Sequence, residues 1–136
     1  MSKKVKMIGV ICAILLCFIT IGNVARAETI NFDVTVNQNK LNKDPMSRKA
    51  SKADGEKNFY VRPTYFSCAA AVKVRSVLHE DYNKYSSWAY VYSDNTNVVT
   101  VNPYNRDVYK GKMYYMQSDY ASGLASEVNM KGRYTP

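Results

Sequence analysis

The stretch WAYVYSDNTNVVTV, Trp88–Val101, decides the fold class of this chain. Its first half alternates large aromatic residues with Ala89 and Val91, and alternation with a period of two is typical of a β-strand. The polar segment Ser93–Thr96 follows, and its Asp and Asn residues favour a turn because their side chains hydrogen-bond to the local backbone. A valine-rich segment comes next. The stretch therefore predicts two strands joined by a tight turn.

Five other segments carry the same alternation or the same enrichment in β-branched and aromatic residues. They are ETINFDVTV (28–36), NFYVR (58–62), AVKVRSVL (71–78), KMYYMQS (112–118) and SEVNMKG (126–132). The strand 58–62 is expected to stop at Pro63, because proline cannot donate a hydrogen bond to a sheet. Short strands about a dozen residues apart are typical of antiparallel sandwiches and barrels.

The sequence thus predicts an all-β fold, a small antiparallel β-sandwich that follows a cleaved signal peptide. Its body is expected over residues 58–136, and the strand at 29–36 should complete one of the two sheets. The residues expected to face the core are Phe32, Val34, Val72, Val74, Val91 and Val128. Lys73 and Arg75, which alternate with two of these valines, should face outward.

The N-terminus has the three parts of a secretory signal peptide. MSKKVK (1–6) is basic, MIGVICAILLCFITIG (7–22) is apolar, and Ala25-Arg26-Ala27 matches an A-x-A cleavage site. We expect cleavage after Ala27 and secretion of the remaining chain. Two of the three cysteines lie within residues 1–27, which leaves Cys68 without an intrachain partner. Its apolar surroundings predict a buried thiol; the alternative is an intermolecular disulfide.

A basic, polar segment separates the first predicted strand from the body, so residues 28–57 are expected to form a strand followed by a flexible arm. Without residues 1–27 the chain has 15 basic and 11 acidic residues, and its net charge falls from +8 to +4. This modest excess argues against nucleic acid as a partner. Five cations of the arm could contact an anionic cell-wall polymer, a membrane surface or a surface protein: Lys40, Lys43, Arg48, Lys49 and Lys52. The alternative is a solvated loop that only keeps the protein soluble.

Trp88, Tyr90 and Tyr92 share one face of their predicted strand, and Ala89 and Val91 share the other. All twelve tyrosines lie between residues 60 and 134, where Leu and Ile are scarce, so aromatic rings are needed to fill a core there. We therefore expect the three aromatic residues to lie in the core or at its rim. The alternative is an exposed aromatic strip, which would suit glycan or peptide binding.

No pattern in the sequence predicts catalysis, a metal site or a cofactor. His79 is the only histidine, and position 83 is Asn where a zinc protease motif would need a second His. Glu80 and Asp81 are adjacent, and neighbouring residues on a strand point to opposite faces, which does not suit a glycosidase pair. We expect a protein that is not an enzyme.

The segments INFDVTV and VNMKGRYTP, together with Arg75-Ser76, resemble those of small secreted all-β proteins of Gram-positive bacteria. Near the end of the chain, the resemblance depends on Val128, Gly132, Tyr134 and Pro136. More distantly, the chain is similar to the lactococcin 972 type of bacteriocin, a small secreted β-sandwich. The resemblance implies a non-enzymatic, bacteriocin-like effector that acts at a cell surface. The alternative is an extracellular module that binds the cell wall or a glycan of the producing bacterium.

Overall fold

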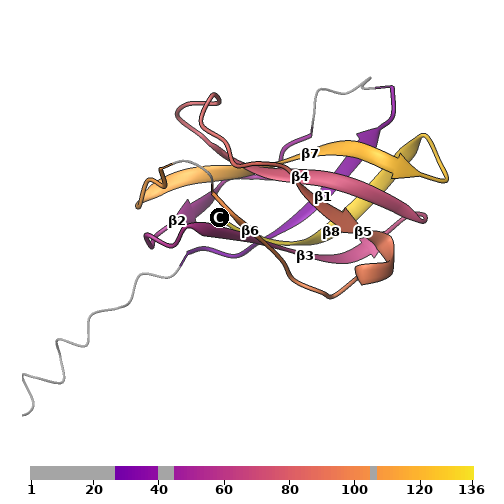
Figure 1. The fold of residues 1–136 in the computed structure, drawn as a ribbon, viewed down its shortest axis with the longest axis horizontal. Helices are drawn as coiled ribbons and strands as arrows, with labels where there is room; N and C mark the ends of the chain where they lie inside the picture. Colours follow the sequence, from indigo (N-terminus) through magenta and orange to yellow (C-terminus); the bar gives the residue numbers. More distant parts are fainter. Residues whose placement is uncertain (1–26, 40–44, 105–106) are drawn as a thin grey trace, which may run out of the picture.

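The computed structural model describes residues 27–39, 45–104 and 107–136. Their strands form two antiparallel sheets of four strands each, which stack as two layers (Figure 1). Among the described residues there is no α-helix, and the predicted all-β sandwich is confirmed. Residues 1–26 of the predicted signal peptide lie outside the described residues, and so do Lys40 and Lys43 of the predicted arm.

The first sheet has the spatial order β1-β8-β3-β6. Its strands are β1 (Ile30–Asn37), β8 (Glu127–Thr135), β3 (Asn58–Phe66) and β6 (Thr100–Pro103). The predicted strand near the N-terminus is thus confirmed, and it pairs with β8 over its whole length, from Ile30 opposite Tyr134 to Asn37 opposite Glu127.

The second sheet has the order β2-β7-β4-β5. Its strands are β2 (Ala50–Lys52), β7 (Lys112–Gly123), β4 (Ala70–Leu78) and β5 (Ala89–Tyr92). The short 3-10 helix η1 (Ser93–Asn95) leads from β5 toward β6, and Asn97 adopts a left-handed backbone conformation with φ of 66°. The turn predicted at this position is confirmed. It carries the chain from the edge of one sheet to the edge of the other.

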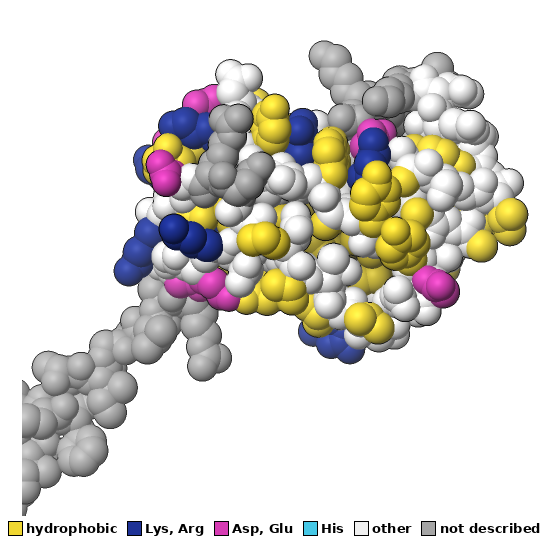
Figure 2. Space-filling model, in the orientation of Figure 1, with side chains coloured by type: hydrophobic (Ala, Val, Ile, Leu, Met, Phe, Trp, Pro, Cys, Tyr) yellow, Lys and Arg dark blue, Asp and Glu magenta, His cyan; other side chains and the backbone are white. Residues whose placement is uncertain are grey.

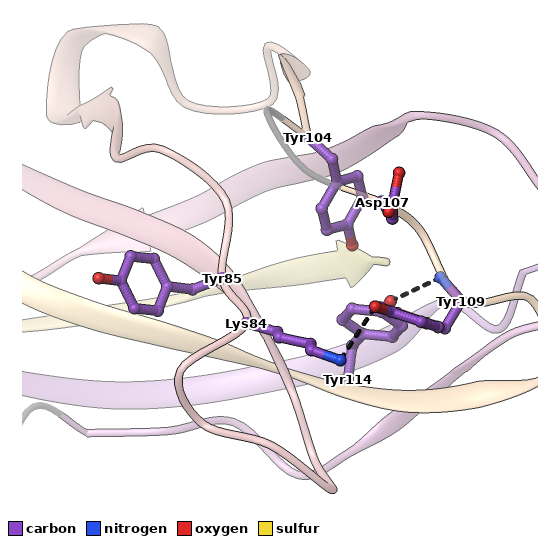
Figure 3. A pocket seen from close by; sticks show the side chains of 6 residues that line it. All are labelled: Lys84, Tyr85, Tyr104, Asp107, Tyr109 and Tyr114. Atoms are coloured by element: carbon purple, nitrogen blue, oxygen red, sulfur yellow. Dashed lines mark hydrogen bonds between the residues drawn. The ribbon is translucent and has the colours of Figure 1, made fainter.

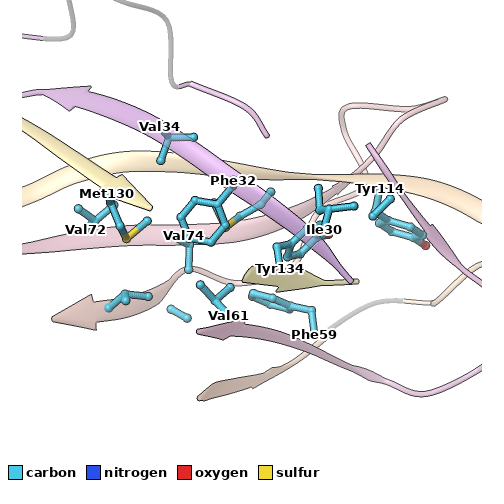
Figure 4. Close-up of a cluster of buried hydrophobic side chains, with 14 of the residues drawn as sticks. Ile30, Phe32, Val34, Phe59, Val61, Val72, Val74, Tyr114, Met130 and Tyr134 are labelled. Atoms are coloured by element: carbon cyan, nitrogen blue, oxygen red, sulfur yellow. The ribbon is translucent and has the colours of Figure 1, made fainter. Parts of the chain in front are cut away.

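The core lies between the sheets (Figure 4). All six residues predicted to face it are buried. Three tyrosines join them: Tyr104, Tyr114 and Tyr134. Tyrosine therefore does fill the core, as the composition indicated, but from β7, β8 and the segment after β6. The rings of Tyr104 and Tyr114 meet edge-to-face with centroids 5.6 Å apart, and Phe59 contacts Tyr104 in the same way.

The buried tyrosine hydroxyls find partners inside the core. The Ser76 hydroxyl of β4 lies 2.6 Å from the hydroxyl of Tyr104 and 2.6 Å from that of Tyr134. Burial raises the pKa of both phenols, so both stay neutral and serve as hydrogen-bonding groups rather than as bases. Ser86 supports the cluster because its hydroxyl accepts a hydrogen bond from the Ser76 backbone N–H at 3.0 Å.

The predicted flexible arm is wrong for residues 45–52. β2 pairs with β7, with Ala50 opposite Tyr114 and Lys52 opposite Lys112, and the side chains of Ser47, Ala50 and Lys52 are buried. The Ser47 backbone N–H donates to the carbonyl oxygen of Met116 at 2.8 Å. This segment is therefore an edge of the second sheet, held by contacts to strands that come much later in the sequence.

Lys52 is fully buried because several acceptors surround its ammonium group. Nζ donates to the carbonyl oxygen of Pro136 at 2.8 Å and of Asn58 at 3.3 Å, and it pairs with the Asp54 carboxylate at 3.2 Å. It also lies 5.4 Å from the centroid of the Tyr104 ring. The prediction that Lys52 contacts an external anionic surface is therefore wrong, because its ammonium group is buried and bound by acceptors of the protein itself.

Replacing Lys52 with methionine is expected to lower the free energy of unfolding by about 1–3 kcal/mol, because two carbonyls and one carboxylate lose their donor while the volume is kept. Chemical denaturation measures the loss. Lys57→Met is the matched control, because Lys57 is exposed, and its effect should stay within about 0.5 kcal/mol. Equal stability of the two variants would contradict the buried role of Lys52.

The predicted end of the third strand at Pro63 is also wrong. β3 continues to Phe66, and the pairing with β8 shifts register between Pro63 and Tyr65. On its other side β3 pairs with β6 only from Asn58 to Val61. Pro63 lies beyond this pairing, so its missing N–H removes no hydrogen bond from the β3–β6 ladder.

Candidate functional site

The aromatic residues of β5 lie on the outer face of the second sheet. The side chains of Ala89 and Val91 are buried, whereas Tyr90 and Tyr92 are 51% and 46% exposed. Trp88, just before the strand, is half-buried. The prediction that these three aromatic residues lie in the core or at its rim is wrong for Tyr90 and Tyr92, and the half-buried Trp88 lies against Lys73 and Arg75 of the outer face. The alternative, an exposed aromatic strip of Trp88, Tyr90 and Tyr92, describes the structure.

The reason lies in the place of β5 at the edge of its sheet. Strand pairing sets Val91 opposite Val72 and Ala89 opposite Val74, so the small side chains of β5 continue the buried valine surface of β4. Tyr90 correspondingly lies opposite Lys73, which faces outward as predicted. Because Ala89 and Val91 face the core, the alternation of the strand turns Tyr90 and Tyr92 outward.

Two cations of β4, Lys73 and Arg75, contact the Trp88 end of the aromatic strip. The guanidinium of Arg75 lies 4.4 Å from the centroid of a Trp88 ring and 4.0 Å from that of Tyr85, so it contacts both rings. The ammonium of Lys73 lies 5.3 Å from the Trp88 ring centroid. Cation–π contacts of this kind hold aromatic side chains in place at a surface. The Trp88 ring thus contacts two cations of β4.

Both cations have a second partner on β7. Lys73 Nζ forms an ion pair with the Asp119 carboxylate at 2.7 Å, and Arg75 Nε donates to Oε1 of Gln117 at 2.6 Å. The charge of Lys73 is therefore paired within the face, whereas Arg75 uses its Nε–H there and keeps its charge. Tyr90 and Tyr92 differ, since their rings lie side by side with centroids 6.3 Å apart and an interplanar angle of 19°. These two rings are the part of the strip that is available to a ligand.

Exposed apolar side chains are not confined to β5. Figure 2 shows hydrophobic side chains at the surface in many places on the face in view, with Lys and Arg side chains between and beside them. Elsewhere on the molecule, Tyr82 is 54% exposed and its ring is stacked on that of Tyr115, with centroids 6.2 Å apart. Clustered exposed rings of this kind mark interaction surfaces more often than isolated ones do.

A cavity of about 400 Å³ lies beside the second sheet. Its lining residues are Lys84, Tyr85, Tyr104, Asp107, Tyr109 and Tyr114 (Figure 3). Lys84 Nζ donates to the Tyr109 hydroxyl at 3.0 Å, and this bond raises the pKa of the lysine. The Tyr114 hydroxyl accepts from the Tyr109 backbone N–H at 3.0 Å. The volume falls within the range of small-molecule sites, about 300–1,000 Å³.

The cavity and the aromatic strip are separate features. Tyr85 lines the cavity, but its ring points away from the other five lining side chains in Figure 3. The same ring stacks on Arg75 at the outer face of the sheet. Sequence reasoning missed the cavity, because its residues come from two loops and β7, and no local pattern links them.

His79 has no arrangement suited to catalysis. Its Nε2 lies 3.4 Å from Lys49 Nζ, its Nδ1 is buried with no hydrogen-bond partner, and its ring meets that of Tyr115 edge-to-face at 5.1 Å. Glu80 binds Lys112 at 2.9 Å instead of forming a carboxylate pair. Among the described residues, no group of three or more His, Cys, Asp or Glu side chains is placed to hold a metal ion.

The remaining predicted cations do not form one site. Arg48 and Lys49 are exposed on the segment before β2, Lys52 is buried, and the other two lie outside the described residues. Cys68, predicted to be buried, is half-buried against the edge of the core and unpaired. Within the part of the chain that is described, no helix has the length and apolar character needed to span a membrane.

Comparisons with known proteins give no match. No protein-family model, no curated protein and no solved structure matches the chain. The similarity to the lactococcin 972 type of bacteriocin therefore stays a prediction from the sequence.

Proposed function

We propose that this protein is a non-enzymatic extracellular binding protein whose aromatic strip binds a glycan of a bacterial cell surface. The observation that carries the proposal is the exposure of Tyr90 and Tyr92 beside Trp88, whose ring contacts Arg75. Tyrosine and tryptophan are the residues that most often dominate binding energy at protein surfaces, because they bury a large rigid area at a small cost in entropy.

The chemistry of the strip favours a sugar over an acidic polymer. A sugar ring has an apolar face of C–H groups, which stacks on an aromatic ring, and a rim of hydroxyl groups. The ammonium of Lys73, opposite Tyr90, is neutralised by the Asp119 carboxylate, so the cation nearest to Tyr90 in the strand register is already paired. Lys73 and Asp119 lie beside Tyr90 in the strand register, and their polar atoms can exchange hydrogen bonds with sugar hydroxyls.

The double variant Tyr90→Ala/Tyr92→Ala is expected to lose binding to washed peptidoglycan, with at least a tenfold rise in the dissociation constant, because each ring supplies a stacking contact. Cosedimentation with purified peptidoglycan, freed of attached anionic polymers, measures the loss. Tyr65→Ala is the matched control, since Tyr65 is 48% exposed on the other sheet. Thermal melting checks that all three proteins are folded.

Unchanged binding of the double variant would overturn the proposal, and so would failure of the parent protein to bind. Retention of a protein or peptide in place of peptidoglycan would assign the strip to a different class of partner. A bacteriocin-like effector would also inhibit the growth of related cells that do not produce it. A binding module of the producing bacterium would be retained on both kinds of cell without inhibiting either.

A further inference from the structure

Two arginines stand next to each other on the outer face of the first sheet, on the side of the sandwich away from the aromatic strip. Arg62 of β3 lies directly opposite Arg133 of β8 in the strand register, and both side chains are exposed. Side chains opposite each other in an antiparallel pair have Cβ atoms about 4.5–5.5 Å apart. The two guanidinium groups are therefore held within reach of a single small ligand.

This arrangement is unfavourable for the protein alone, because like charges directly opposite each other destabilise a sheet. The acids nearby are already engaged. Asp33 accepts from Asn129 at 2.7 Å and pairs with Lys131 at 3.1 Å. These two contacts, the first being the larger, hold the pKa of Asp33 below its ordinary value.

Glu56, the next acid along this side, accepts a hydrogen bond from the Tyr60 hydroxyl. On the far side of Arg133 the register places Asn31, which is neutral and exposed. Among the described residues, no ion pair reaches Arg62 or Arg133. The pair thus lacks the compensating anion that like charges in this position need.

We propose that Arg62 and Arg133 form a binding site for a phosphate group. A guanidinium presents a planar fork of N–H donors that matches a phosphate bidentately, and two forks from neighbouring strands can share the oxygens of one group. The amide of Asn31 is the neutral donor closest in register. Phosphate removes the repulsion that the free protein bears.

The site is independent of the proposed glycan site, because it lies on the other sheet and uses no aromatic ring. Its ligand class is a phosphate ester, carried either by a soluble polymer or by the headgroup of a lipid. Exposed apolar residues on or beside the same sheet, near the arginine pair, would suit contact with a lipid surface. These are Tyr65, Val99 and Val101, with exposed fractions of 48%, 47% and 53%.

The test is a thermal melt of the purified protein with inorganic pyrophosphate against chloride at equal ionic strength. Pyrophosphate is expected to raise the melting temperature of the parent, because a ligand that binds only the folded state stabilises it. Arg62→Gln should weaken pyrophosphate binding about tenfold, since half of the charged hydrogen bonds are lost. Without pyrophosphate and at low salt, the same variant should melt at or above the parent, because the repulsion is gone.

Arg48→Gln is the matched control. It removes one exposed arginine that belongs to the segment before β2 and not to the first sheet. This variant should keep the full response to pyrophosphate. An equal loss of response in Arg48→Gln and Arg62→Gln would show a dependence on net charge alone, and it would overturn the site. The site would also be overturned if pyrophosphate did not raise the melting temperature of the parent and phosphatidylglycerol vesicles did not retain it.

Vesicle flotation separates the two sources of phosphate. Vesicles of phosphatidylglycerol mixed with phosphatidylcholine should retain the parent but not Arg62→Gln if a lipid headgroup is the ligand. If the ligand is soluble, pyrophosphate and glycerol phosphate should bind while these vesicles retain neither protein. Either result supports a phosphate site at this pair.

Discussion

Val74→Asp is expected to leave the protein unfolded at room temperature. Val74 is completely buried at the centre of β4, with Ala89 of β5 on one side and Ser118 of β7 on the other. Among the described residues the buried cation is Lys52, which is already engaged by Asp54 and by backbone oxygens, so a carboxylate at position 74 would be unpaired, and removing it from water costs several kcal/mol. The whole stability of a domain of this size is about 5–15 kcal/mol.

Far-ultraviolet circular dichroism and a denaturant titration measure this loss. Val101→Asp is the matched control, because the same substitution is made at a valine that is 53% exposed, and its stability should stay within about 0.5 kcal/mol of the parent. Burial raises the folded-state pKa of the new carboxyl group above that of the unfolded chain. The deficit should therefore shrink as the pH falls from this raised pKa toward about 4 and level off below it, where the carboxyl group is neutral in both states. A Val74→Asp protein that melts like the parent would show that β4 is not central to the core.

The strand pattern of the sequence predicted most of the fold because, in strands such as β1, the residues that face the core are apolar and alternate with polar ones. In β1, Ile30, Phe32 and Val34 alternate with polar residues, and only one register can bury them. The same holds for Val72 and Val74 of β4. Where the pattern is unambiguous, the sequence determines both the strand and the side of it that faces the core.

The orientation of β5 could not be predicted in this way, because both of its faces carry apolar or aromatic side chains. A period of two identifies the strand but not its orientation when Ala89 and Val91 alternate with larger rings. The orientation follows from the pairing with β4, because Ala89 and Val91 continue the buried surface of Val74 and Val72. Those facts belong to the tertiary structure, and the exposed strip could therefore be predicted only as an alternative.

The burial of Lys52 could not be predicted from the sequence around it either. A lysine among Ser, Ala and Asp residues reads as part of a solvated segment. Its acceptor at Pro136 is 84 positions away along the chain. The Arg62–Arg133 pair could not be predicted for the same reason, since the two residues become neighbours only through the register of β3 on β8.

Gly132 occupies a place in β8 where no other residue fits. It lies in the central part of the first sheet, with Phe32 of β1 on one side and Pro63 of β3 on the other. A Cβ atom added here would lie 2.7 Å from Cζ of Phe32 and 2.9 Å from Cα of Pro63, and closer still to the carbonyl oxygen of Arg62. Two of these three atoms belong to the backbone of a paired strand, which cannot move aside as a flexible side chain can.

Gly132→Ala is therefore expected to lower the free energy of unfolding by about 3 kcal/mol or more, at the upper end of the cost of overpacking a core. Denaturant titration measures the loss, and Gly55→Ala is the control, because nothing lies within 4 Å of a Cβ at that position. Adding Phe32→Leu should recover only part of the loss, since it relieves the contact with the ring but leaves the contacts with the backbone of β3. Full recovery in the double variant would show that the ring alone excludes a side chain, and a Gly132→Ala protein as stable as the parent would contradict the close approach of β8 and β3.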